Sequence, residues 1–131
     1  DLAVDGGGSI FFFFFGWVAK YETTGRLVWK RSFWFSSEFR DYMRGIAVDA
    51  SGAIYVTGVD YSADADICVV KFDAAGGLLW KRRLGTEDWD WASDVAIDGV
   101  GSLYLTGATQ GSLQGDNRGG YDAWVAKYST R

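Results

Sequence analysis

The sequence predicts an all-β protein made of three related antiparallel sheets, and three observations support this. One unit is written nearly three times, with 44 residues from Ala3 to Ala47 and 49 residues from Ala47 to Ala96. Each copy contains short runs rich in β-branched and aromatic residues, separated by turns that contain glycine. The chain has no proline, and no stretch shows helical periodicity.

The first two strands of each copy are expected to form a hairpin. A short apolar segment ends in aspartate, and a glycine follows three residues later: Asp5 and Gly8, Asp49 and Gly52, Asp98 and Gly101. This spacing predicts a tight turn in which the aspartate caps backbone amides and the glycine takes a positive φ. The second strand then pairs back, and we expect Gly58 and Gly107 to end it in the second and third copies.

Two further strands are expected after a loop of variable length. The third strand covers 17–21, 68–72 and 124–128, and the fourth covers 27–30 and 78–81. Four short antiparallel strands in each unit of this length favour the blades of a β-propeller. The blades would span 1–44, 45–93 and 94–131, the last one lacking its fourth strand. Three blades are too few for a ring, so we expect either a partial ring completed by further copies or part of a larger propeller.

The repeated residues resemble a known family. The pattern A-V-D-x-x-G-x-Y-V-T-G is followed by D-x-x-V-x-K-[YF]-x-x-x-G-x-L-x-W, and it is most complete in the second copy, at Asp49, Gly52, Tyr55, Thr57, Gly58, Asp66, Lys71, Gly76 and Trp80. This pattern resembles the bacterial and archaeal β-propeller repeat called SBBP. The resemblance implies a propeller of secreted or envelope-associated proteins, used as a scaffold or interaction module. It implies no particular reaction.

The run Phe11 to Phe15 departs from the repeat. The loop before the third strand has seven residues in the second copy (59–65) and fourteen in the third (108–121), but none in the first when Phe14 is aligned with Gly58. Even the tightest hairpin needs two loop residues. Three alternatives remain: a loop is missing near Phe15 and Gly16, the phenylalanines are not true side chains, or the chain turns tightly at Phe14, Phe15 and Gly16.

Composition argues against several classes of function. The net charge is −4, and the lysines and arginines are scattered, which argues against a nucleic-acid groove. No window approaches the roughly 20 apolar residues of a membrane-spanning helix. The single cysteine, Cys68, is expected to be a small buried hydrophobe. We expect no cofactor.

Reactive side chains are few. The chain has no histidine, which excludes the common nucleophile pairs and the commonest metal ligand. Candidate carboxylates for catalysis are Glu87, Asp88, Asp90 and Asp94. The acidic loops 60–66 and 87–90 are also considered as calcium sites, but neither has the pattern of an EF-hand. We interpret these carboxylates as turn or strand-edge residues and the loops as solvated, and we predict no metal site.

Aromatic residues are the remaining functional signal. Trp29 and Trp80 occupy the same position in the fourth strand and are expected to pack between blades, while Trp17 and Trp124 are expected in the core. The tryptophans without an equivalent are Trp34, Trp89 and Trp91. Exposed in loops, these three would bind a glycan or a protein partner; buried, they would fill the gap between blades.

The expected function is a non-enzymatic scaffold or protein-interaction module of a secreted or cell-surface protein, for example as the subunit of an assembly. Its partners would be another protein, further copies of itself or further blades of a longer chain. Two alternatives are kept. One is a carbohydrate-binding propeller that uses the loop tryptophans, and the other is an extracellular glycan hydrolase or lyase with paired carboxylates.

Overall fold

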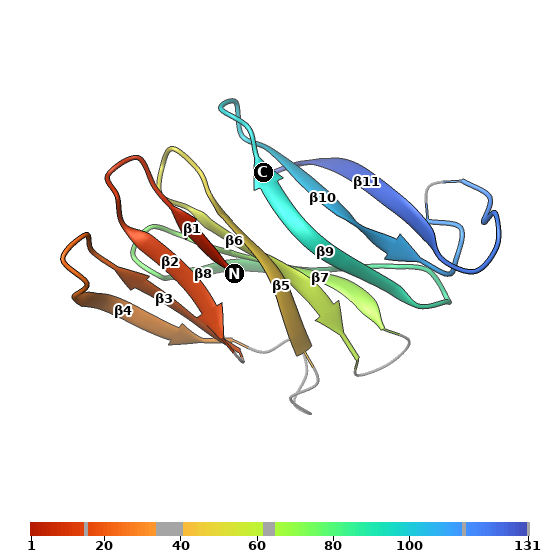
Figure 1. Ribbon diagram of the computed structural model, residues 1–131, viewed down its shortest axis with the longest axis horizontal. Coiled ribbons are helices and arrows are strands. Elements are labelled where there is room, and N and C mark those ends of the chain that lie inside the picture. The colour runs from red at the N-terminus through yellow and green to blue at the C-terminus, as the bar shows by residue number, and fades with distance from the viewer. Residues whose placement is uncertain (15, 34–40, 62–64, 114, 131) are drawn as a thin grey trace.

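The computed structural model describes residues 1–14, 16–33, 41–61, 65–113 and 115–130, and the regular elements among them are all β-strands. These strands form three antiparallel sheets of three or four strands, which confirms the all-β prediction. Figure 1 shows the sheets following one another across the molecule. Within the described residues there is no helix long and apolar enough to cross a membrane.

In every sheet each strand pairs with its neighbour in the chain. The first sheet contains β1 (Leu2–Val4), β2 (Ile10–Phe14), β3 (Trp17–Tyr21) and β4 (Leu27–Ser32). The second contains β5 (Asp41–Val48), β6 (Ile54–Asp60), β7 (Asp66–Phe72) and β8 (Leu78–Leu84). The third contains β9 (Asp90–Ile97), β10 (Ser102–Thr109) and β11 (Asp122–Ser129). β5 and β9 thus begin four residues before the expected repeat boundaries at 45 and 94.

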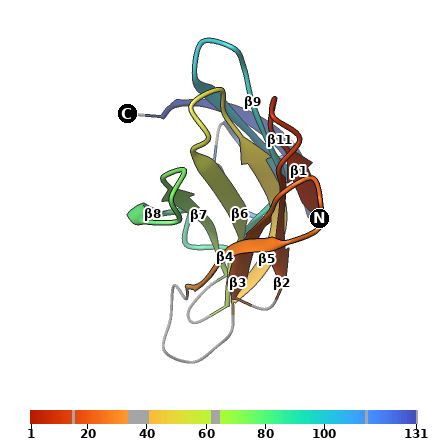
Figure 2. The ribbon, with the colours of Figure 1, turned by 90° about the vertical axis from the view of Figure 1, so that its left-hand side faces the viewer.

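The first strands of the sheets lie next to one another. β5 contacts both β1 and β9, and these three strands run through the middle of the molecule in Figure 1. Figure 1 shows β4 at the edge of the molecule, and Figure 2 shows β8 set apart from this central group. The last strands β4 and β8 are correspondingly the most exposed of their sheets.

The aspartate turns form as predicted. The carboxylate of Asp49 accepts hydrogen bonds from the backbone amides of Ser51 and Ala53, both at 2.9 Å, and Gly52 has a φ of 83°. The turns of the other two copies have the same arrangement, at Asp5 with Gly8 and at Asp98 with Gly101. A left-handed conformation of this kind favours glycine, because a side chain would clash with the backbone.

The expected ends of the second strands were wrong. β6 continues two residues beyond Gly58, and β10 continues two residues beyond Gly107. Both glycines stand opposite a β-bulge in the preceding strand. A Cβ on Gly58 would lie 2.0 Å from the carbonyl oxygen of Tyr42, and one on Gly107 would lie 1.9 Å from that of Trp91. These glycines therefore allow two backbones to approach closely inside the sheet, and they do not end the strand.

The phenylalanine run forms strand β2. Phe14 pairs with Trp17, so β2 and β3 are joined by a tight connection in which Gly16 has a φ of 71°. This is the tight-turn arrangement among the three alternatives. Phe15 lies outside the described residues.

Two hydrophobic cores lie between the sheets. Phe11, Val18 and Trp29 pack against the face of the second sheet that carries Ile54 and Val56. The opposite face of the second sheet, with Tyr55 and Val69, packs against the third sheet. The second sheet is therefore covered on both faces, which explains why its central strands are apolar with little alternation.

Several residues placed in the core by the sequence are found there. Trp29 is buried between the first two sheets and donates a hydrogen bond from its Nε1 to the carbonyl oxygen of Ala74, at 3.3 Å. Trp80 packs against the core between the second and third sheets, where Trp124 is buried. Cys68 is fully buried, as predicted.

The prediction for Trp17 was wrong. Its side chain is 41% exposed, on the outer face of the first sheet. The repeat position of Trp17 is the one held by Cys68 and Trp124, which are both buried. They are covered by the preceding sheet, whereas no described residues form a sheet over the outer face of the first one.

Candidate functional site

A cleft lined by aromatic side chains lies between the second and third sheets. We call it the aromatic cleft; it has a volume of about 330 Å³ and is lined by Arg44, Tyr61, Trp89, Trp91, Ser93 and Tyr121. The lining residues come from four segments that are far apart in the sequence. Concave sites with several aromatic side chains and a few polar groups are typical of ligand binding.

Two of the polar residues are positioned by β-bulges. Arg44 is the extra residue where the pairing of β5 with β6 shifts between Met43 and Gly45. Ser93 is the extra residue of β9, opposite the step from Thr106 to Gly107. A bulge redirects a side chain that regular pairing would place elsewhere. Because β5 and β9 are neighbours, the two bulges bring Arg44 and Ser93 into one cleft.

The rings of the cleft contact one another mainly edge to face. Tyr61 contacts Tyr42 with ring centroids 5.4 Å apart and Trp89 with centroids 6.2 Å apart. Trp91 and Tyr121 form a second pair at 4.9 Å. Trp89 is 50% exposed and Tyr121 is 53% exposed, so both present ring surface to solvent. Contacts of this geometry hold the rings in place without burying them.

Arg44 gives the cleft a positive charge. Of the described residues that line the cleft, Arg44 alone has a side chain that is charged at neutral pH. Within the part of the chain that the structure describes, no carboxylate lies within salt-bridge distance of its guanidinium. Its donors therefore remain available to a ligand.

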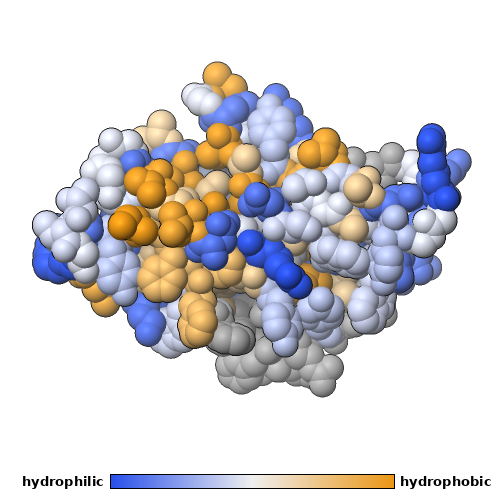
Figure 3. Space-filling model, viewed as in Figure 1, coloured by the Kyte–Doolittle hydropathy of each residue, from blue (hydrophilic) through white to orange (hydrophobic). Residues whose placement is uncertain are grey.

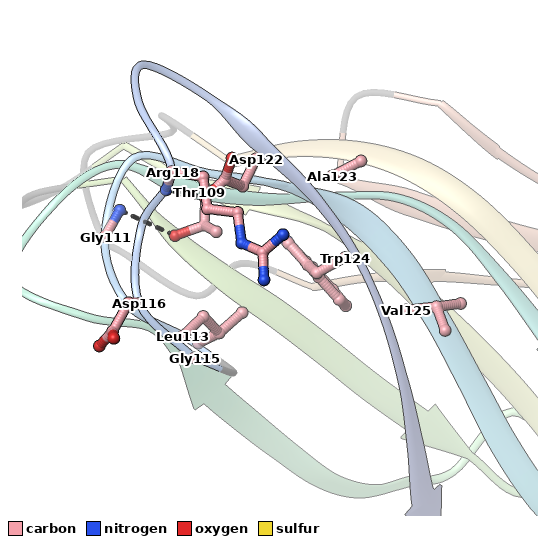
Figure 4. A pocket seen from close by; sticks show the side chains of 10 residues that line it. All are labelled: Thr109, Gly111, Leu113, Gly115, Asp116, Arg118, Asp122, Ala123, Trp124 and Val125. Carbon is pink, nitrogen blue, oxygen red and sulfur yellow. Dashed lines mark hydrogen bonds between the residues drawn. The ribbon is translucent and has the colours of Figure 1, made fainter.

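A second cavity is enclosed by the long loop between β10 and β11. We call it the loop cavity; its volume is about 520 Å³, and it is lined by residues that include Leu113, Asp116, Arg118, Asp122 and Trp124. Figure 4 shows the Arg118 side chain extending from the loop toward Trp124. Asp122 accepts a hydrogen bond from the backbone amide of Arg118 at 2.8 Å, which holds the loop against β11. The cavity thus carries charges of both signs.

A partly buried ionic group lies at one end of the second sheet, next to the start of β9. Arg83 of β8 pairs with Asp60, which is buried, and approaches Asp66 at 3.8 Å. Asp90 is also buried and accepts hydrogen bonds from the amide and hydroxyl of Thr86. No group of three or more acidic or cysteine side chains that could hold a metal ion occurs among the described residues.

The four carboxylates considered for catalysis lie in different surroundings. Glu87 and Asp88 are exposed in the loop before β9, whereas Asp90 is buried at the start of that strand. Asp94 is exposed in β9 and accepts a hydrogen bond from the amide of Val95 at 2.8 Å. None of the four lines the aromatic cleft.

The structure brings together two of the three tryptophans that the sequence singled out. Trp89 and Trp91 line the same cleft, although Trp91 belongs to strand β9 and not to a loop as predicted. Trp34 lies outside the described residues. Sequence reasoning missed Arg44, Tyr61 and Tyr121. The only signal for them was that none recurs in the other copies, since the repeat itself does not require these side chains.

Comparison with known proteins shows similarity to larger proteins. No protein-family model matches the chain. Among curated proteins, the regulatory protein FlaEY of Caulobacter vibrioides is 27% identical over 131 aligned positions, covering 86% of this chain and 14% of that protein.

Two solved structures resemble the fold of this chain. A protein of unknown function from Bacteroides caccae superposes with a TM-score of 0.59 at 12% identity, covering 98% of this chain and 44% of the other. The tail fiber of Staphylococcus aureus phage P68 superposes with a TM-score of 0.61, also at 12% identity, over 98% of this chain and 28% of the other. The chain therefore shares its all-β fold with longer proteins, and it spans less than half the length of each of the three.

Proposed function

We propose that the chain is a section of a β-propeller built from SBBP-type repeats. It acts as a non-enzymatic scaffold or protein-interaction module of a secreted or cell-surface protein. Further sheets of the same repeat, in a longer chain or in further copies, cover the outer faces of the first and third sheets. The observation that carries this proposal is the exposure of apolar side chains at repeat positions that are buried in the middle sheet.

The outer face of the third sheet is uncovered in this way. Val125 of β11 occupies the repeat position of Val69 in β7. Val69 is 2% exposed because the third sheet covers it, whereas Val125 is 68% exposed. Burying one side chain of this size contributes about 1.5–3 kcal/mol. The repeat therefore retains an apolar residue at a position that is useful only when another sheet covers it.

The outer face of the first sheet shows the same feature. Phe12 of β2 is 36% exposed, and its counterpart Val56 in β6 is fully buried. Leu2, Val4 and Ile10 are also exposed on this face. In Figure 3 hydrophobic residues gather over the part of the surface where β1 and β2 lie. Contiguous apolar patches of this kind mark interaction surfaces.

The two outer faces are of complementary kinds. In the second sheet, Tyr55 and Val69 lie on one face and Ile54 and Val56 on the other. In both interfaces, the face of one sheet that corresponds to Tyr55 and Val69 packs against the face of the next sheet that corresponds to Ile54 and Val56. The third sheet leaves its Tyr55-type face exposed, and the first sheet leaves its Ile54-type face exposed. Stacking would therefore continue head to tail, and such heterologous contacts generate rings when the rotation closes.

The comparisons support the proposal without testing it. The similar proteins are all longer than this chain, as expected of proteins with more repeats. One of them carries the name of a phage tail fiber, which is consistent with a structural role outside the cell.

Self-association of the 131-residue chain tests the proposal. We expect sedimentation velocity to show assembly that increases with protein concentration. Val125→Glu and Phe12→Glu should each abolish it, because each places a charge in one of the two faces. An equimolar mixture of the two variants should form a one-to-one complex and grow no further, since only one intact pair of faces remains.

A matched control separates this from a general charge effect. Val100 is 89% exposed in the turn between β9 and β10, away from both faces, so Val100→Glu should assemble like the wild type. A wild-type chain that stays monomeric at high concentration would contradict the proposal. Dimers that persist in either single variant would contradict the head-to-tail arrangement.

A further inference from the structure

We propose that the aromatic cleft binds an acidic sugar residue of a polysaccharide, a uronic acid whose ring stacks on Trp89 and whose carboxylate pairs with Arg44. The site is separate from the sheet stacking proposed above, because Trp89 and Arg44 belong to the cleft between the second and third sheets and not to the apolar faces at either end.

Two of the rings that line the cleft are half-exposed, unlike the aromatic residues of the cores. Trp89 and Tyr121 are half-exposed, while the aromatic residues that serve packing, Phe11, Tyr55 and Phe72, are fully buried. A tryptophan presents a flat apolar surface with a polar edge, which matches the apolar C–H face and hydroxyl edge of a pyranose ring. The edge-to-face contacts of Trp89 with Tyr61 hold this surface ready for a ligand.

The charge of the cleft selects an anion. The chain carries a net charge of −4, yet no carboxylate is found among the described residues that line this cleft, and Arg44 is the single strong cation among them. A guanidinium binds a carboxylate through two parallel hydrogen bonds, a geometry that few other groups match. An apolar side chain from a partner protein would fill the space between the rings but leave Arg44 without a counter-charge.

The size and polarity of the cleft also suit a sugar. Its volume of about 330 Å³ lies at the lower end of the range of roughly 300–1,000 Å³ found for small-molecule sites. The hydroxyls of Ser93, Tyr61 and Tyr121 add donors and acceptors among the rings. Sugars need this combination of flat apolar surface and surrounding polar groups.

The loop cavity is the natural comparison site. It also contains an arginine, Arg118, but Asp116 and Asp122 line the same space. A bound anion would therefore meet negative charges as well as the guanidinium. This difference makes Arg118 a suitable control for Arg44.

Titration of the 131-residue chain with acidic oligosaccharides tests the proposal. The probes are tetramers of galacturonate, of mannuronate and of hyaluronan, added while the indole N–H signals are followed by NMR. At least one probe should shift the signals of Trp89 and Trp91, with a Kd on the order of 0.1–1 mM. The methyl ester of that probe should bind at least about tenfold more weakly, because it keeps the ring and loses the charge.

Substitutions then locate the site. Arg44→Gln should weaken binding of the acidic probe about tenfold and remove the preference over its ester, while Arg118→Gln changes neither. Trp89→Ala should weaken both forms of the probe, and Trp17→Ala, an exposed tryptophan on another face, should not. Tyr121→Ala serves as a second ring variant, with thermal unfolding of each variant as the check on folding.

The opposite results overturn the proposal. These are the absence of indole shifts with all three acidic probes, equal binding of acid and ester, or acidic binding that survives Arg44→Gln. Shifts of Trp89 and Trp91 caused by a proline-rich peptide but by none of the sugars would also overturn it, in favour of a protein partner.

Discussion

A group of three side chains recurs behind the aspartate turns. The hydroxyl of Tyr55 donates to Asp49 at 3.2 Å, and the Lys71 ammonium lies 5.2 Å from the centre of the Tyr55 ring. The same arrangement occurs with Asp98, Tyr104 and Lys127. In the first copy Phe11 replaces the tyrosine, so the contact with Lys20 remains while the hydrogen bond to the aspartate is lost. The group ties the turn to the second and third strands.

Removing the Asp49 carboxylate should destabilise the protein measurably. Asp49→Ala leaves the amides of Ser51 and Ala53 without their acceptor and frees the Tyr55 hydroxyl, so we expect a loss of about 1–3 kcal/mol in the free energy of unfolding. Urea denaturation measures it. Asp88→Ala is the matched control, because Asp88 is exposed and its carboxylate accepts no hydrogen bond from the described residues. Equal losses in the two variants would contradict a specific role for the turn.

The same carboxylates make stability depend on acid. Burial by itself raises the pKa of Asp49, but the hydrogen bonds from Ser51, Ala53 and Tyr55 outweigh it, so the net pKa is below the ordinary value of 3.8. Hydrogen bonds from the amide of Ser102 and from Tyr104 likewise lower the pKa of Asp98. As the pH falls, these carboxylates take up protons at a higher pH in the unfolded state than in the folded state. Their contribution to stability is therefore complete above the pKa of the unfolded state, and it is lost as the pH falls through the pKa of the folded state.

We therefore expect the Tm to fall as the pH is lowered below about 4. Asp49→Asn cannot ionise at that position, so its Tm should decline less steeply over the same range. Calorimetric scans between roughly pH 2 and pH 6 measure both slopes. Parallel curves for the variant and the wild type would show that Asp49 contributes nothing to the acid sensitivity.

At the scale of the strands, a β-bulge opposite the same repeat glycine shapes the second and third sheets. Gly58 and Gly107 allow β5 and β9 to approach with one extra residue, and those extra residues are Arg44 and Ser93 of the aromatic cleft. The threonine before each glycine donates a hydrogen bond to a carbonyl of the next strand, from Thr57 to Cys68 at 2.9 Å and from Thr106 to Trp124 at 3.0 Å. The Thr-Gly pair is thus a structural feature of the middle of the strand.

Adding a methyl group at this point should cost more than at a glycine with open space around it. Gly58→Ala would drive Cβ into the backbone of Tyr42, so we expect a loss of about 2–4 kcal/mol in stability. Gly99→Ala is the control, because a Cβ there meets no atom within 4 Å. Chemical denaturation of both variants compares them, and a Gly58→Ala protein as stable as the Gly99→Ala protein would refute the close-approach explanation.

At the scale of the whole molecule, the sheets differ in how well they are covered. The second sheet is packed on both faces, and every residue of β6 is buried. The first and third sheets are each packed on one face only by described residues. Local opening should therefore require the least free energy in the outer sheets and the most in the middle one.

Amide hydrogen exchange tests this order. We expect the amides of β6 and β7 to exchange at least about tenfold more slowly than those of β2 and β10. Like β6, β2 and β10 are the second strands of their sheets along the chain. Assembly through the outer faces should slow β2 and β10 selectively, so the experiment is run on the Val125→Glu variant as well. Uniform protection across the three sheets in that variant would contradict the order.

Much of the fold was predictable because it depends on neighbours in the chain. The spacing of Asp49 and Gly52 specifies a turn through local hydrogen bonds and a positive φ, so the hairpins and the three all-β units follow from the sequence. The lengths of the strands could not be predicted in this way. In the sequence, a glycine that ends a strand cannot be distinguished from a glycine that faces a bulge in the neighbouring strand. Gly58 shows this difference.

The sequence by itself determined the repeat, the turns and the short apolar runs that make three small sheets. Only the tertiary structure decided which faces of those sheets are covered, since burial depends on what lies opposite. Trp17 and Trp124 share one repeat position, yet only Trp124 is buried. Tertiary structure alone also brought Arg44 beside Trp89, because the bulges and the neighbouring first strands join residues that the sequence keeps far apart.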